Sequence, residues 1–195
     1  MSLDYRKDID GLRAISIIPV VLFHAGISIF SGGYVGVDIF FVISGYLITS
    51  IILSDIKKDR FSISSFYFRR FKRIFPGLFP VLFITLISTY ILFTPYDFKS
   101  FGKSLTGASL FVSNIVFWAD GDGYFNTISE SNPLLHTWSL SVEEQFYIFF
   151  PITFYLLYKY KFKYNRFFTT VLILSFIISV FLAIYEKVCT ILLFI

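Results

Sequence analysis

Long apolar runs separated by short polar stretches form the main pattern of this chain. Six apolar segments stand out, and each is close to the roughly 20 residues that a helix needs to cross the hydrocarbon core of a bilayer. They cover residues 12–30, 35–53, 76–93, 101–118, 138–158 and 167–185. The pattern predicts an all-α fold, a polytopic bundle of transmembrane helices. We detect no internal repeat and no linker, so residues 1–195 are predicted to form a single membrane-embedded domain.

The positions of lysine and arginine predict how the bundle is oriented, because these residues concentrate in cytoplasmic loops. Basic residues precede the first segment and fill the stretch 57–73, so both regions and the N-terminus should be cytoplasmic. The basic stretch 159–166 should also lie inside, but six full crossings would place it outside. We therefore predict that 101–118, the least apolar segment, is re-entrant, which leaves 119–137 external.

Composition supports a membrane protein over a soluble one. The 195 residues are 56% hydrophobic and only 15% charged, which is too apolar for a soluble monomer. The net charge of +4 lies at the ends of apolar segments, which indicates membrane topology and not nucleic-acid binding. A single cysteine, Cys189, and two histidines exclude an intramolecular disulfide and a cysteine-built metal site, so no metal is predicted. The first segment lacks a small-residue cleavage site and should be a retained span.

Arg13 and His24 are the ionisable residues that the first segment places on one helix. They are eleven residues apart, so they share nearly the same face and lie roughly 16 Å apart along the axis. His24 is expected about halfway down the span, where an ionisable group must face protein or water. It could donate one hydrogen bond to a neighbouring helix. It could instead be a general base, or a nucleophile that carries an acyl group.

A basic run between the second and third segments is a second candidate site. Arg70 and Arg73 are one helical turn apart, and Arg69 and Arg73 also stack at i, i+4. Guanidinium groups bind phosphate bidentately, so this run suits the phosphates of an acyl-CoA. The alternative is a topology signal whose side chains reach lipid headgroups. Pro76 follows the run and is predicted to start the next helix.

The start of the fifth segment carries several polar residues in the stretch 136–147. Ser141 and Glu144 have capping-box spacing, and acids are favoured near a helix N-terminus. Capping explains one glutamate. It does not explain two glutamates together with a glutamine and a histidine at the edge of a membrane helix, where each costs energy unless it is paired. The further candidates are Glu143, His136, Ser139 and Gln145, together with Asp38 near the start of the second segment, which could also simply mark the membrane interface.

Four stretches, 10–14, 32–48, 69–76 and 136–147, strongly resemble the acyltransferase 3 family of membrane O-acyltransferases. That family includes bacterial acetylases of lipopolysaccharide O-antigen and of peptidoglycan. The resemblance runs in the family's order from about residue 8 to about residue 151. It implies a bundle of about ten helices that moves an acyl group, usually acetyl, from cytoplasmic acyl-CoA to a hydroxyl of a cell-envelope polysaccharide.

The resemblance also implies roles for the candidate residues. The family's arginine–histidine pattern falls on Arg13 and His24, and its paired-arginine pattern falls on Arg70 and Arg73. On this interpretation the donor phosphates bind to the arginines on the cytoplasmic side, with Arg69 and Arg13 as further donor-binding candidates. His24 then activates the acceptor hydroxyl or is itself acylated, and Glu143 or Glu144 orients an imidazole. Acetyl-CoA would be a substrate, with no bound cofactor.

The chain is shorter than members of this family, and residues 186–195 do not resemble what the family has at that place. We therefore expect the front half of a truncated bundle in the inner membrane. One alternative function is an inactive or partner-dependent fragment of the enzyme. A weaker alternative is a transporter or channel, against which the chain shows no duplicated half and no paired broken helices.

Overall fold

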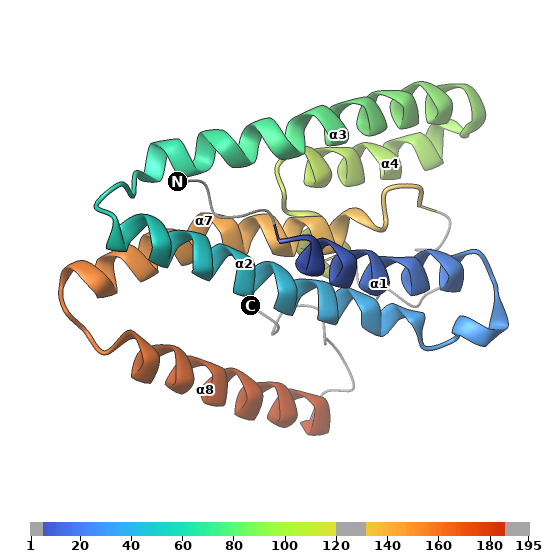
Figure 1. Ribbon diagram of the computed structural model, residues 1–195. Coiled ribbons are helices and arrows are strands. Elements are labelled where there is room, and N and C mark those ends of the chain that lie inside the picture. Colours follow the sequence, from blue (N-terminus) through green and yellow to red (C-terminus); the bar gives the residue numbers. More distant parts are fainter. Residues whose placement is uncertain (1–5, 120–131, 186–195) are drawn as a thin grey trace. The chain divides into compact units, whose positions relative to one another are not determined.

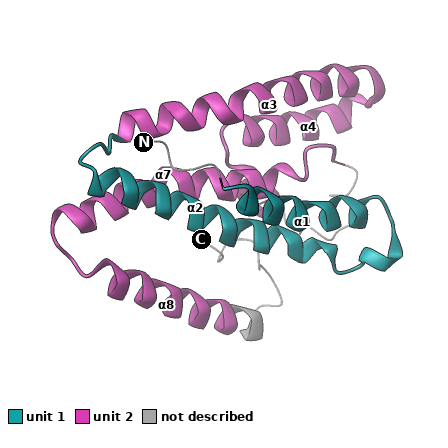
Figure 2. Cartoon of the chain, viewed as in Figure 1, with its two compact units in different colours: residues 1–62 teal, residues 63–195 magenta. Residues whose placement is uncertain are grey.

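The computed structural model describes residues 6–119 and 132–185, with side chains to residue 181. Throughout these ranges the regular structure is helical, which confirms the predicted all-α class. The chain divides into two compact units, Met1–Ser62 and Ile63–Ile195 (Figure 2). Each unit is described below by itself.

The first unit is a helical hairpin. Helix α1 (Lys7–His24) is followed by two short 3₁₀ helices, η1 (Ser28–Phe30) and η2 (Gly33–Val35), and then by α2 (Gly36–Lys57), which runs back along α1 (Figure 1). Two glycines allow this close approach: a Cβ added at Gly33 would lie 2.2 Å from the carbonyl oxygen of Pro19, and one at Gly36 would lie 2.0 Å from that of Ser16.

Helix α1 begins and ends earlier than the predicted segment 12–30. It ends at His24 because Gly26 adopts a left-handed conformation (φ 76°). The N–H of Gly26 donates to the carbonyl of Phe23 at 3.0 Å, and the N–H of Ile27 donates to that of Leu22 at 3.2 Å. These two bonds form a Schellman motif, which satisfies the last carbonyls of the helix and turns the chain away.

The second unit contains the other five helices of the described residues. They are α3 (Ile63–Leu92), α4 (Pro95–Ser109), α5 (Ser113–Ala119), α7 (Thr137–Lys159) and α8 (Tyr164–Tyr185). Helix α4 folds back along the C-terminal half of α3 (Figure 1). Phe101, Ala108 and Leu134 are buried at this junction, packed against Leu82, Leu86, Phe93, Phe98 and Leu105. Helix α8 packs on α7 through aromatic rings, with the centroids of Phe150 and Phe168 at 5.2 Å.

The start of the third helix corrects the sequence interpretation. Pro76 was expected at the first helical position, but α3 begins at Ile63 and continues through Pro76 and Pro80. The basic run therefore lies on the helix and not in a loop before it. Proline has no N–H to donate to the carbonyl four residues earlier, yet helices in membranes tolerate this loss where other groups compensate.

The segment 101–118, predicted to be re-entrant, contains a break between two helices. Helix α4 ends at Ser109 and α5 starts at Ser113, with Phe111 in a left-handed conformation (φ 55°) between them. The 15 residues of α4 reach only about 22 Å, which is less than the hydrocarbon core. Whether this segment is re-entrant in a membrane stays a prediction. The stretch 119–137, predicted to be external, falls largely on residues 120–131, outside the described ranges.

Within the described residues, three helical stretches are long and apolar enough to cross a membrane. They are Gly33–Lys57, Ile63–Leu92 and Tyr164–Phe181, which correspond to the second, third and sixth predicted segments. The membrane orientation stays a prediction.

Candidate functional site

Helices α3 and α7 bring the basic run of one helix against the acidic stretch of the other. The hydroxyl of Tyr67 on α3 donates to the carbonyl oxygen of Ile148 on α7 at 2.6 Å. Phe66, one residue earlier, is 1% exposed. These contacts place the next turn of α3, with Arg70, opposite the second and third turns of α7.

Two aromatic rings hold the guanidinium of Arg70. Its Cζ lies 5.6 Å from the ring centre of Phe66, one turn earlier on the same helix. It also lies 4.8 Å from the ring centre of Tyr147 on α7. A cation over the face of an aromatic ring is attracted by the ring quadrupole. Arg70 is half-buried, and among the described residues its guanidinium forms no ion pair with a carboxylate.

Two carboxylates of α7 lie within electrostatic range of Arg70. Glu143 accepts a short hydrogen bond from the hydroxyl of Tyr147, one turn further along the helix. Glu144 is only 7% exposed, and its Oε1 has no hydrogen-bond partner among the described residues. A buried carboxylate oxygen without a partner is costly, so Glu144 is a candidate to meet a further polar group.

The other arginines of the run differ in their surroundings. Arg73 is exposed, and its charge is close enough to Arg70 for the two to repel each other. Arg69 is also exposed and donates to the hydroxyl of Ser65 at 2.9 Å on its own helix. The structure thus brings Arg70 together with Glu143 and Glu144, with Arg73 one turn away.

The predicted capping box at the start of α7 is wrong. The helix begins at Thr137, with His136 as its N-cap residue, so Ser141 lies in the second turn. The Ser141 hydroxyl donates to the carbonyl of Thr137 at 3.0 Å and accepts from the N–H of Ser113 on α5 at 3.1 Å. Ser139 donates to the carbonyl of His136 at 3.1 Å, and His136 itself is exposed.

Gln145 is a packing residue in the described structure. Its Nε2 donates to the carbonyl of Phe111 and to Oδ1 of Asn114, both at 2.9 Å. Asn114 returns a bond to Oε1 of Gln145 at 3.2 Å. These three bonds attach the turn between α4 and α5 to α7, so no reaction is needed to explain this side chain.

In the first unit, α1 carries both Arg13 and His24. Cζ of Arg13 lies 4.9 Å from the ring centre of Phe40 on α2. His24 was expected within a longer span, but it is the last residue of α1 and is exposed. Its Nδ1 lies 2.8 Å from the carbonyl oxygen of Val20. If that contact is the N–H bond, the neutral ring presents Nε2 as the basic nitrogen.

Asp38 lies in the first turn of α2 and is exposed. An acid in the first turn of a helix is favoured by the helix dipole. Whether Asp38 belongs to a site or marks the membrane interface stays a prediction.

Sequence reasoning missed two residues of the α3–α7 site, namely Phe66 and Tyr147. Both stand four residues from a charged candidate that was recognised: Phe66 before Arg70, and Tyr147 after Glu143. On a helix this spacing places side chains on one face in contact. Applying that rule to the basic and acidic runs would have found both rings.

Comparison with known proteins identifies the family. A family model described as an acyltransferase domain matches residues 6–194. The match includes the stretch 8–151 that carried the sequence resemblance and continues to residue 194, into the stretch 186–195 that was expected to depart from the family.

Two relatives are bacterial O-acetyltransferases. The peptidoglycan O-acetyltransferase OatA of Listeria monocytogenes is 38% identical over 151 residues, covering 77% of this chain and 24% of the relative. The O-acetyltransferase OatA of Staphylococcus aureus is 38% identical over 159 residues, covering 80% of this chain and 26% of the relative. This chain therefore spans about a quarter of the length of these relatives. No solved structure matches. Since the family model covers nearly the whole chain, the protein belongs to the acyltransferase 3 family of membrane acyltransferases.

Proposed function

We propose that this chain takes part in the transfer of an acetyl group from acetyl-CoA to a hydroxyl of peptidoglycan, in the cell membrane, with its N-terminus in the cytoplasm. Membership of an acyltransferase family supports the reaction class. The name of the Listeria relative, which is 38% identical, supports peptidoglycan over lipopolysaccharide as the acceptor.

The arginine pair of α3 is the observation that carries the donor assignment. Arg70 and Arg73 are three residues apart on one helix and repel each other, so a multivalent anion between them would be stabilised. Acetyl-CoA offers a pyrophosphate and a 3′-phosphate, and the planar guanidinium matches the geometry of a phosphate. The rings of Phe66 and Tyr147 attract the Arg70 guanidinium, whose five N–H groups include donors for such a ligand.

His24 is the proposed catalytic residue. As a general base, it takes the proton of the acceptor hydroxyl while the oxygen attacks the acetyl carbonyl, and the thiolate of CoA leaves and is protonated. As a nucleophile, its imidazole nitrogen first takes the acetyl group as the C–S bond breaks and the CoA thiolate leaves. The acceptor oxygen then attacks the acetyl-imidazole, the imidazole leaves, and the hydroxyl proton ends on the thiolate. The sequence-based hypothesis that Glu143 or Glu144 orients an imidazole is part of this proposal.

The first test uses the full chain in isolated membranes supplied with acetyl-CoA labelled in the acetyl group. We expect His24→Ala to abolish transfer of label to added peptidoglycan while leaving the affinity for CoA within about twofold. Arg70→Ala should weaken CoA binding at least about tenfold, since a charged hydrogen bond contributes about 1.5–3 kcal/mol. Arg60→Ala, which removes an exposed arginine just before α3, is the matched control.

Each part of the proposal can fail separately. Equal label incorporation by the wild-type chain and His24→Ala would remove His24 from the chemistry. Equal CoA affinities of Arg70→Ala and Arg60→Ala would remove the donor site. No transfer of label by the wild-type chain would favour the alternative of an inactive or partner-dependent fragment.

A further inference from the structure

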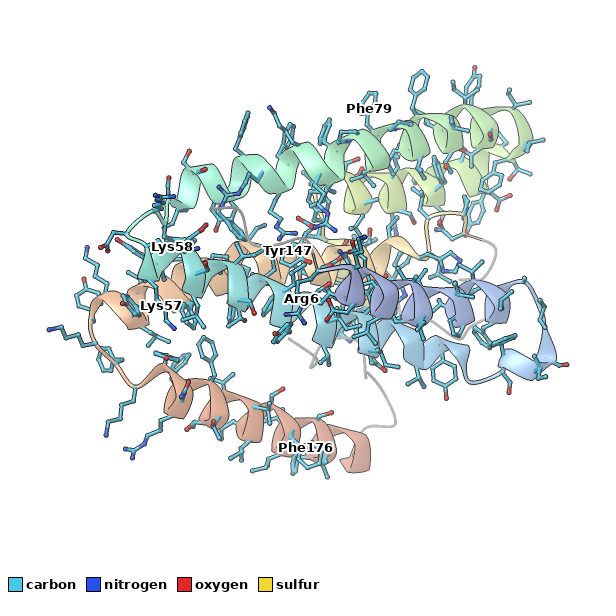
Figure 3. All side chains as sticks on the ribbon, viewed as in Figure 1. Arg6, Lys57, Lys58, Phe79, Tyr147 and Phe176 are labelled. Carbon is cyan, nitrogen blue, oxygen red and sulfur yellow. The ribbon has the colours of Figure 1, made fainter. Side chains whose placement is uncertain are left out.

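Tyr147 contacts a base and an acid of the α3–α7 site with different parts of one side chain. Its ring lies 4.8 Å from Cζ of Arg70, and its hydroxyl donates to Glu143. The residue is 5% exposed and is labelled on α7 in Figure 3. We propose that Tyr147 is a positioning residue, which holds the Arg70 guanidinium in the orientation that binds a phosphate of the acyl donor. This inference rests on the donor site proposed above.

The hydroxyl of Tyr147 fixes the plane of its ring. Glu143 stands four residues earlier on the same helix, so the hydrogen bond joins two neighbours on one face of α7. A buried tyrosine has two torsions, and burial together with this bond restricts both. The ring is therefore a fixed surface on which a guanidinium can lie.

The neighbouring acid explains why such a surface is needed. Glu144 is buried, its Oε1 has no hydrogen-bond partner among the described residues, and its charge acts on Arg70. An arginine free to move would be drawn into a bidentate pair with that carboxylate, which would use the donors that a phosphate needs. A ring face attracts the cation without using an in-plane N–H.

Phe66 cannot replace Tyr147 in this role. Phe66 is on α3, so it moves together with Arg70, whereas Tyr147 fixes the guanidinium relative to α7 and its acids. A separate contact, from the Tyr67 hydroxyl to the Ile148 carbonyl at 2.6 Å, holds the two helices together at this level. Changes at Tyr147 should therefore alter the position of the Arg70 guanidinium more than they alter the docking of α3 on α7.

The test measures CoA binding to the full chain in lipid nanodiscs. We expect Tyr147→Met, which fills a similar space without a ring, to weaken CoA binding roughly fivefold, within the range of a partly buried cation–π contact. Tyr147→Phe keeps the ring and loses only the bond to Glu143, so it should weaken CoA binding less than Tyr147→Met does. In the Arg70→Ala background, Tyr147→Met should cause no further loss, because its partner is already gone.

A fluorinated phenylalanine at position 147, compared with Tyr147→Phe, provides a second measurement that preserves the shape of the side chain. Fluorine withdraws electron density from the ring face and weakens its attraction for the Arg70 cation. CoA affinity should therefore fall as fluorine atoms are added. A residue that only fills space would show no such dependence. The series remains decisive if Tyr147→Met does not fold.

The outcomes distinguish this inference from the function on which it rests. If Arg70→Ala leaves CoA affinity unchanged, the donor site itself is wrong. If Arg70→Ala weakens binding while Tyr147→Met and fluorination do not, the donor site stands and the positioning role is wrong. An equal effect of Tyr147→Met with and without Arg70 would also overturn the role, since it would show that Tyr147 acts through general packing.

Discussion

Replacing Gln145 by leucine should destabilise the chain without touching the proposed donor site. The substitution removes three hydrogen bonds, two from Nε2 of Gln145 and one that its Oε1 accepts from Asn114. Leucine has nearly the same volume, so the change is mainly one of polarity and not of packing. What remains is a turn between α4 and α5 that is more weakly attached to α7, chiefly through the bond from the N–H of Ser113 to the hydroxyl of Ser141.

The cost follows from the bonds lost and from the groups left behind. Hydrogen bonds between membrane helices average about 0.6 kcal/mol each, which gives about 2 kcal/mol for three. Asn114 is 1% exposed, so its amide loses a partner that water cannot replace. An unsatisfied buried group adds about 1–3 kcal/mol. We therefore expect Gln145→Leu to lower the free energy of unfolding by about 3–5 kcal/mol.

The measurement is reversible unfolding of the chain in mixed micelles, followed by circular dichroism at rising denaturant fraction. Ser139→Ala is the matched control on the same helix, because it removes one local bond, to the carbonyl of His136. CoA affinity of the folded fraction should be unchanged in both variants. If Gln145→Leu unfolds no more easily than Ser139→Ala, the three bonds do not hold the turn and the reasoning is refuted.

Two further stability predictions follow from the helix contacts. Gly36→Ala should destabilise the first unit by about 2–3 kcal/mol, because the added Cβ would lie 2.0 Å from the carbonyl oxygen of Ser16. Gly77→Ala, with nothing within 4 Å, should be neutral or stabilising, and an equal loss in both variants would contradict the close-packing argument. Thr94→Ala should cost about 1 kcal/mol, since Thr94 caps α4 by accepting from the N–H of Asp97. Thermal unfolding checks this value, and Thr94→Ser should restore most of it.

The helical class and the approximate places of the helices could be predicted from hydropathy, but two boundaries could not. The end of α1 depends on Gly26, whose left-handed conformation is one of several that a glycine can adopt. The start of α3 was masked by Pro76, which is common both at the first position of a helix and inside membrane helices. A hydropathy pattern does not show whether a helix continues through such a residue or ends there. Tertiary contacts decide between these two outcomes.

The sequence predicted the residues of the candidate site, but it did not predict that α3 and α7 bring them together. The arginine pair and the two glutamates were found because charged residues near apolar segments are rare and noticeable. Their meeting across α3 and α7 depends on a hydroxyl–carbonyl bond between Tyr67 and Ile148, and neither residue carries a sequence signal for its partner. Gln145 was selected for the same reason as the glutamates, although its bonds to Phe111 and Asn114 explain it as a packing residue.

Neither helix could hold its half of the α3–α7 site alone. Without α3, the buried carboxylate of Glu144 would lose the nearby positive charge that offsets part of its desolvation. Without α7, Arg70 would lose the ring of Tyr147 and keep only Phe66, which is on its own helix. The charges therefore reach their arrangement only when the two helices dock. On the proposed function, a donor that binds there would recognise the docked pair of helices and not the arginine motif by itself. We therefore expect a peptide carrying only residues 66–73, which lacks the fixed guanidinium, to bind phosphate without specificity.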